Sequence, residues 1–189
     1  MKRFIIFAGV NGAGKTTLFQ AADAYTDIPR VNIDEMVREK GSWKDKQLVT
    51  NVGKNAVEKI NDFLSNGISF NQETTLCGRS IRNNIKKAKE SGYEIELFYV
   101  GLASPELAIE RVEKRVRDGG HGIPEKDVRR RFDESLKNLQ EVIPLCNLVR
   151  VYDNTVQFRK IATYINGKCV DIATDVPGWC KFLVSPEAE

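Results

Sequence analysis

The stretch Gly9-Val10-Asn11-Gly12-Ala13-Gly14-Lys15-Thr16 decides the fold, because it fits the phosphate-loop pattern G-x-x-x-x-G-K-[ST]. Residues 3–8, which precede it, form an apolar run typical of a buried strand. Residues 17–22, which follow it, can continue as a helix. Strand, glycine loop and helix therefore come in the order that a phosphate loop requires, although the same letters could also form a glycine-rich turn that merely carries a lysine.

Each part of the stretch suits a polyphosphate. Glycines allow positive φ angles and a close approach of backbone N–H groups to phosphate oxygens, and the helix that follows adds its positive N-terminal end. Lys15 would reach the β- and γ-phosphates, and the Thr16 hydroxyl would coordinate Mg²⁺. We expect the nucleotide to contact Gly9, Asn11, Gly12, Ala13, Gly14, Lys15, Thr16 and Thr17.

The composition indicates one soluble domain. The chain has 189 residues, of which 41% are hydrophobic and 29% charged, and its net charge of +3 is too small to argue for nucleic acid. No apolar run approaches the roughly 20 residues that cross a bilayer, so we expect no membrane partner. Four scattered cysteines, one histidine and no secretion signal favour free thiols and a cytoplasmic location over disulfides or a metal centre.

Strands and helices alternate through most of the chain. After the first pair, strands are expected at 28–32, 68–73, 93–100 and 148–152, and helices at 34–40, 44–66, 78–90, 104–118 and 125–142. This alternation predicts an α/β fold, a three-layer, doubly wound, mainly parallel sheet that binds its ligand at the carboxyl ends of the strands.

The last segment differs in character. Residues 1–155 are expected to form the core, and residues 156–189 a small antiparallel appendage packed on it, within a single domain overall. The appendage should contain strands at 157–165, 168–173 and 181–184, with Asn166-Gly167 as a hairpin turn.

Two polar clusters follow predicted strands and should lie near the γ-phosphate. In Asn32-x-Asp34 the aspartate can orient a substrate hydroxyl and accept its proton, or it can simply cap the next helix. In the stretch Gln72–Thr75, Glu73 could hold acceptor hydroxyls or complete the Mg²⁺ shell through water, and the sequence does not separate these roles. Thr74 could contact the substrate, or Thr74 and Thr75 could cap the next helix.

A third cluster is the basic segment 111–131, which holds eight arginines and lysines against four acids. Two helices joined through the glycine-rich residues 119–124 could form a lid whose arginines spread charge over the phosphates, although such a run is more often a solvated face. Arg111 and Arg115 lie one turn apart and could reach the phosphates together. His121, the sole histidine, either contacts phosphate or substrate, or is structural.

Taken together, an ordered set of residues resembles the short bacterial branch of the zeta-toxin kinases. The similarity extends from the phosphate loop to about Asn154 and rests on Asn32-x-Asp34, the run from Gln72 to Ser80, Gly92-Tyr93, Arg111-Val112 with Arg115-Val116, Gly119-Gly120-His121-x-Ile123-Pro124, Arg130-Arg131-Phe132 and Tyr152-Asp153-Asn154. Where the long toxins place a second arginine before the proline of the lid, this chain has His121.

The resemblance implies a P-loop kinase fold and transfer of the ATP γ-phosphate to a hydroxyl, with Mg²⁺. In the long toxins the acceptor is the sugar 3′-hydroxyl of UDP-N-acetylglucosamine, and a protein antitoxin blocks the nucleotide site. Carried onto this chain, Lys15 and Thr16 bind ATP and Mg²⁺, Asp34 resembles the catalytic base, and Arg111 or Arg115 the lid arginine. The expected substrate residues are Asn32, Glu73, Thr74, Arg79 and His121, and Asn154 is expected beside the nucleotide.

Two other functions use the same loop. A nucleotide-hydrolysing switch should carry a guanine motif N-K-x-D or an L-S-G-G-Q segment, and the chain has neither. A kinase of nucleic-acid ends would suit the basic segment, but residues 111–131 contain no aromatic residue on which a base could stack. The sequence thus favours a kinase of a sugar nucleotide or similar metabolite.

Overall fold

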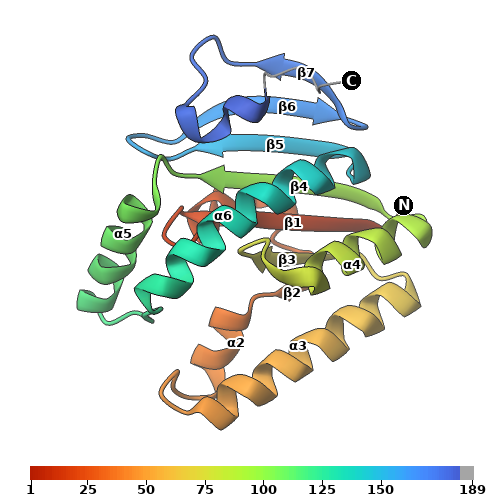
Figure 1. Cartoon of the computed structure of the whole chain (residues 1–189). Coiled ribbons are helices and arrows are strands. Elements are labelled where there is room, and N and C mark those ends of the chain that lie inside the picture. Colours follow the sequence, from red (N-terminus) through yellow and green to blue (C-terminus); the bar gives the residue numbers. More distant parts are fainter. Residues whose placement is uncertain (184–189) are drawn as a thin grey trace.

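The fold is seen in a computed structural model, which describes residues 1–183. The strands are β1 (Arg3–Gly9), β2 (Arg30–Val31), β3 (Phe70–Thr74), β4 (Glu94–Gly101), β5 (Leu148–Asp153), β6 (Arg159–Ile165) and β7 (Lys168–Ile172). They form one seven-stranded sheet in the order β2-β3-β1-β4-β5-β6-β7 (Figure 1). The first five in this order run parallel, whereas β6 and β7 are antiparallel additions to the β5 edge.

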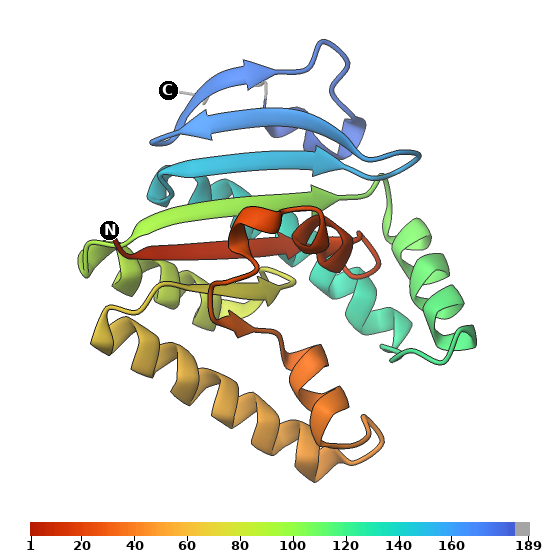
Figure 2. The ribbon, with the colours of Figure 1, turned by 180° about the vertical axis from the view of Figure 1, so that it is seen from behind.

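The helices make the outer layers. They are α1 (Lys15–Gln20), α2 (Ile33–Lys40), α3 (Lys46–Asn66), α4 (Gly78–Glu90), α5 (Pro105–Arg117) and α6 (Glu125–Val142), with 3-10 turns η1 (Asp23–Tyr25), η2 (Ile143–Leu145) and η3 (Gly178–Leu183). Figures 1 and 2 show α4 and α6 on one face of the sheet and α1 on the other. The predicted three-layer α/β architecture is therefore confirmed.

The side-chain alternation of β1 explains the two layers. Phe4 and Ile6 are fully buried against α3, α4 and α6, while Ile5 and Phe7 are fully buried on the opposite face, beside α1 and η1. Successive side chains of a strand point to opposite faces, so a strand covered on both faces is apolar throughout. This is the physical reason why residues 3–8 form an unbroken apolar run.

Most predicted elements are present with small shifts at their ends. The helices at 78–90 and 125–142 have the predicted bounds, and Asn166 and Gly167, both with positive φ, turn the chain between β6 and β7. Gly53 does not interrupt the long helix α3.

One predicted strand is wrong. Lys181 lies in the 3-10 turn η3 rather than in a strand at 181–184, of which Val184 lies outside the described residues. The Trp179 ring covers Gly101 at the end of β4, and Cys180 and Leu183 are buried in the core. A compact turn can direct these three side chains to one side, whereas a strand would alternate them.

Candidate active site

The phosphate loop has the backbone that its glycines predict. Gly9, Gly12 and Gly14 have positive φ angles of 146°, 73° and 96°. A Cβ on Gly9 would lie 2.1 Å from the Val100 carbonyl oxygen, and one on Gly12 would lie 3.0 Å from the Arg111 Cβ. These glycines therefore let the loop fit tightly between β4 and α5.

Lys15 lies inside this loop. Its Nζ donates hydrogen bonds to the carbonyl oxygens of Gly9 (3.1 Å) and Val10 (3.2 Å). Burial lowers the pKa of Lys15, while the nearby carboxylates of Glu73 and Asp34 act in the opposite direction. The ammonium is thus held where an anion would relieve its desolvation.

Asn154, which follows β5, is hydrogen-bonded to the phosphate loop. Its Nδ2 donates to the Ala13 carbonyl oxygen at 2.9 Å, and a Cβ on Gly14 would lie 2.9 Å from the same nitrogen. Asn154 and the buried Ala13 therefore hold the shape of the loop. Neither of them lines the cavity described below.

Glu73, at the end of β3, connects the loop to the second strand. Its carboxylate accepts hydrogen bonds from Thr16 Oγ1 at 3.1 and 3.2 Å, from Asn32 Nδ2 at 3.1 Å and from Arg30 Nη2 at 2.6 Å. Its side chain is 9% exposed. A buried carboxylate paired with an arginine and two neutral donors is held in one orientation.

Asn32 and Asp34 have different tasks at the start of α2. The Asn32 side chain accepts from the backbone N–H groups of Asp34 (2.9 Å) and Glu35 (3.4 Å), so Asn32 is the N-cap of α2. The interpretation of Asp34 as the cap is therefore wrong. Asp34 lies in the first helical turn, where its exposed carboxylate faces the cavity.

The basic segment is divided between α5, a loop at 118–124 and α6. Arg111 Nη2 donates to the Thr155 carbonyl oxygen at 3.1 Å. Arg115 Nε and Nη2 are buried, and within the described part of the chain they have no hydrogen-bond partner. Gly120 makes this possible, because a Cβ there would lie 2.6 Å from the Arg115 Cγ.

His121 packs against an aromatic ring from another loop. Its imidazole stacks on Trp43 with the ring centroids 3.7 Å apart and the planes 12° from parallel. Burial lowers the pKa of His121, Asp34 opposes this shift, and Arg115 and Arg131 add to it. The pair joins the loop between α2 and α3 to the loop between α5 and α6.

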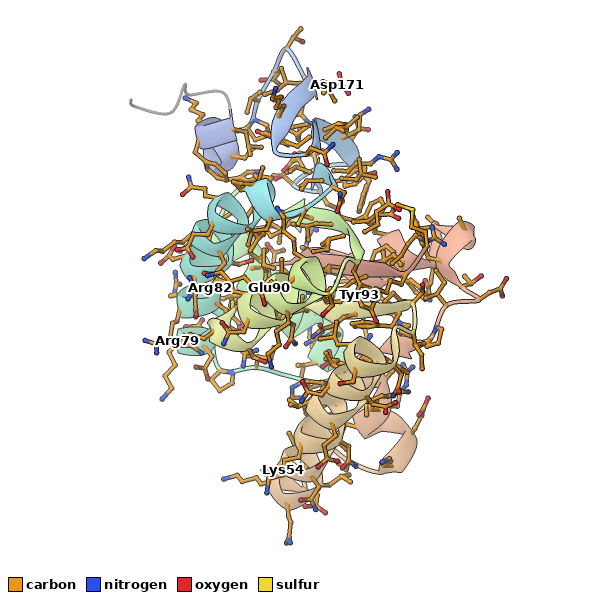
Figure 3. The ribbon with its side chains drawn as sticks, turned by 90° about the vertical axis from the view of Figure 1, so that its right-hand side faces the viewer. Lys54, Arg79, Arg82, Glu90, Tyr93 and Asp171 are labelled. Carbon is orange, nitrogen blue, oxygen red and sulfur yellow. The ribbon has the colours of Figure 1, made fainter. Side chains whose placement is uncertain are left out.

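These groups surround one cavity of about 920 Å³, within the range typical of ligand pockets. The predicted site residues that line it are Asn11, Gly12, Gly14, Lys15, Thr16, Thr17, Asn32, Asp34, Glu73, Thr74, Arg111, Arg115 and His121. Gly9, the first residue of the loop, does not line the cavity. Arg79 does not line the cavity, and Figure 3 shows its side chain pointing away from the body of the protein.

Trp43, which lines the cavity, and Arg30, which donates to Glu73, are among the residues that were not singled out from the sequence. Arg30 lies in the short strand β2, where its guanidinium pairs with Glu35 and Glu73 and lies 3.6 Å from the centre of the Phe19 ring. Trp43 lies in the loop between α2 and α3. An arginine inside an apolar strand was the available signal for Arg30, and the sequence offered none for Trp43.

The residues present fit a magnesium nucleotide. The Thr16 hydroxyl and the Glu73 carboxylate are hard oxygen ligands beside the loop, and Mg²⁺ on nucleotides takes few protein ligands. Among residues 1–183 no group of three or more histidines, cysteines and acids could hold a metal ion by itself. The buried, unpaired nitrogens of Arg115 suit an anion.

The structure has a P-loop kinase fold. Its features are the sheet order, the glycine loop and the two helices, α5 and α6, that carry the basic segment. A chain of the AvrRxo1-ORF1:ORF2 complex with ATP superimposes with a TM-score of 0.71 at 17% identity, covering 97% of this chain and 63% of that one. A chain of the PezAT toxin–antitoxin system of Streptococcus pneumoniae gives a TM-score of 0.61 at 17% identity, covering 90% and 72%.

The sequence itself defines the family. The sequence model of the Zeta toxin family matches residues 2–166, and the chain therefore belongs to that family. An uncharacterised protein of Haemophilus influenzae is 30% identical over 128 residues, which are 68% of this chain and 91% of the relative. The chain spans only about three fifths of the length of the AvrRxo1 chains that it resembles.

No helix in the described part of the chain is both long and apolar enough to cross a membrane.

Proposed function

We propose that this protein is a kinase that uses ATP and Mg²⁺ to phosphorylate a hydroxyl group of a sugar nucleotide or similar small metabolite. The observation that carries the proposal is the meeting of Lys15, Asp34, Glu73 and Arg115 around one cavity. Membership of the Zeta toxin family supports the same reaction.

Each residue has a chemical task in this proposal. The phosphate loop and Lys15 bind the β- and γ-phosphates, and Arg115 Nε and Nη2 supply the donors that stabilise charge on the transferring group. Thr16 and Glu73 would hold Mg²⁺ through their oxygens, and the ion would neutralise further phosphate charge. Glu73 thus orients the Thr16 hydroxyl, which is expected to bind Mg²⁺.

Transfer then needs a base. The acceptor oxygen bonds to the γ-phosphorus, the bond from that phosphorus to the bridging oxygen of ADP breaks, and the hydroxyl proton passes to the Asp34 carboxylate. Asp34 is suited to this because Asn32, rather than Asp34, satisfies the backbone of α2. Its carboxylate is left free to face the cavity.

The direct test is a transfer assay. The protein is incubated with Mg²⁺, ATP and UDP-N-acetylglucosamine, and then with a metabolite pool, and mass spectrometry looks for an added phosphate. We expect one acceptor to gain phosphate in step with ADP formation. Hydrolysis of ATP with no phosphorylated acceptor would instead indicate a nucleotide-hydrolysing switch.

The first mutational prediction concerns Asp34. Asp34→Asn should lower the rate of transfer about 10²- to 10⁴-fold, the usual contribution of a general base, and leave ATP binding intact. Single-turnover kinetics and calorimetric titration of a non-hydrolysable ATP analogue measure the two quantities. Glu39→Gln, on the same helix and exposed outside the cavity lining, is the control. Undiminished transfer by Asp34→Asn would remove its role as base.

A protein antitoxin and a cytoplasmic location complete the proposal. The Streptococcus pneumoniae structure is described as a toxin–antitoxin system, which supports a protein inhibitor for a member of the same fold. Co-purification of the chain with the product of an adjacent gene, together with loss of ATP binding in that complex, tests this part.

A further inference from the structure

Gly53 is an unfavourable residue for its position, the interior of a helix. It lies in the interior of α3, where a glycine makes a helix less stable than an alanine does. Its φ angle is not positive, and a Cβ built on it meets no atom within 4 Å. Neither backbone conformation nor close packing therefore explains this glycine.

The position of Gly53 suggests another reason. It lines the cavity together with Ala56, Val57 and Ile60, which share one face of α3 at helical spacing. The missing side chain leaves empty space inside the cavity, next to this face. A glycine that gives up helix stability to leave room in a cavity makes space for a ligand.

The surroundings of that space are apolar. Val57 is 49% exposed and Ile33, on α2, is 38% exposed, and both line the cavity. We call the surface formed by Ile33, Gly53, Ala56, Val57 and Ile60 the apolar wall. Asp34 follows Ile33 on α2, so the proposed base stands at the border of this wall.

Polar side chains also line the cavity. They are those of Thr75, which precedes α4, and of Ser80 and Asn84, which lie on α4. The phosphate loop, by contrast, is approached by Arg111 of α5 and by Asn154. The part of the cavity lined by α3 and α4, which we call the chamber, thus combines apolar with hydrogen-bonding side chains.

We infer that Gly53 determines acceptor specificity, because the space that it leaves beside the apolar wall admits a ring of the acceptor that a larger side chain would exclude. This rests on the proposed kinase function and names a residue of this chain that selects the acceptor. A sugar ring or a nucleobase has a non-polar face, and its polar edge would meet Asn84 and Ser80. An open-chain polyol has no flat apolar face to cover Ile33 and Val57.

Filling the space tests the inference. Gly53→Ala and Gly53→Val are compared with wild type in calorimetric binding of UDP-N-acetylglucosamine and, separately, of a non-hydrolysable ATP analogue. Transfer from ATP to UDP-N-acetylglucosamine, N-acetylglucosamine and ribitol is measured in parallel. Asn55→Val is the matched control, because Asn55 is exposed on the same helix and does not line the cavity.

We expect Gly53→Val to weaken binding of the ring acceptor about ten-fold or more, since the added methyl groups occupy its place, while affinity for the ATP analogue changes less than about two-fold. Gly53→Ala should raise the melting temperature by roughly 2–4 °C, which shows that lost affinity is not lost folding. Asn55→Val should leave both affinities unchanged.

The inference and the proposed function fail differently. Equal acceptor affinity in wild type and Gly53→Val, or transfer to ribitol but to neither ring compound, would overturn the inference and leave the kinase standing. If a ring compound binds in a way that depends on Gly53 but never gains phosphate, the proposed kinase function is contradicted and the inference about Gly53 stands. Failure of wild type to bind either ring compound also refutes the inference.

Discussion

At the scale of single residues, the site depends on side chains that orient the proposed functional groups through hydrogen bonds. Arg30 is 13% exposed and donates to Glu35, Asn71 and Glu73 at once. Glu73 in turn accepts from Thr16, the residue expected to carry Mg²⁺. The direction in which Glu73 points therefore depends on a residue that does not line the cavity.

Arg30→Gln should show the effect of that support. With the ion pair lost, Glu73 is left buried with weaker partners, so we expect kcat to fall about 10- to 100-fold, as for other groups that orient metal-site ligands. The Mg²⁺ concentration for half-maximal activity should rise, which a purely structural role would not cause. Arg82→Gln, which removes a surface pair with Glu141, is the control. A normal Mg²⁺ dependence in Arg30→Gln would contradict the role.

Arg115 presents the opposite situation, because its buried Nε and Nη2 have no hydrogen-bond partner among residues 1–183. Buried donors that lack hydrogen bonds cost about 1–3 kcal/mol each, so Arg115 is expected to lower stability in the absence of an anion. Arg115→Met keeps the aliphatic stem against Gly120 and removes the unpaired nitrogens.

We therefore expect Arg115→Met to unfold at the same or a higher denaturant concentration than wild type, yet to transfer phosphate about 10²- to 10³-fold more slowly. Chemical denaturation and single-turnover kinetics measure the two. Arg117→Met, exposed on the same helix, should change neither. A variant that is both less stable and fully active would show that Arg115 is structural.

At the scale of elements, the sequence predicts those helices and strands that their own residue pattern specifies. Residues 3–8 are apolar because both faces of β1 are covered, and Pro105 begins α5 one residue after the Ser104 cap. The 3-10 turn at 178–183 could not be predicted, since it depends on Trp179 meeting Gly101 of a distant strand. The same holds for Trp43 on His121, where two loops meet only in the folded chain.

This stacked pair makes stability depend on pH. The folded pKa of His121 lies below its ordinary value of 6.5, so the unfolded chain binds a proton more readily. The stabilisation that comes with a neutral His121 is complete above about pH 6.5 and is lost as the pH falls toward the folded pKa.

His121→Phe keeps an aromatic ring for Trp43 but cannot be protonated. Between about pH 7.5 and pH 5.5, the melting temperature of wild type should fall more steeply than that of the variant, with the difference opening below about pH 6.5. Thermal unfolding followed by circular dichroism across this range measures it. Parallel curves for the two proteins would mean that the histidine ring carries no depressed pKa.

At the scale of the whole molecule, β6, β7 and η3 follow the proposed site residues in the sequence and pack on the same sheet and core. β6 pairs with β5, Trp179 Nε1 donates to the buried Asp153 carboxylate at 2.9 Å, and Tyr164 donates to the Leu183 carbonyl oxygen at 3.1 Å. Asp153 ends the strand that precedes Asn154, the residue that holds the phosphate loop. Residues 156–183 are thus connected to the site through Asp153 and Asn154.

We therefore predict that the chain unfolds as one cooperative unit that includes β6 to η3. Trp179→Ala removes a ring packed on Gly101 and leaves Asp153 buried with fewer donors, so the free energy of unfolding should fall by about 3–5 kcal/mol in a single transition. Far-UV circular dichroism in urea measures this, with Val156→Ala, at a position 92% exposed, as the control. Two separate transitions, the larger unmoved by Trp179→Ala, would instead mean that residues 156–183 fold apart from the kinase core.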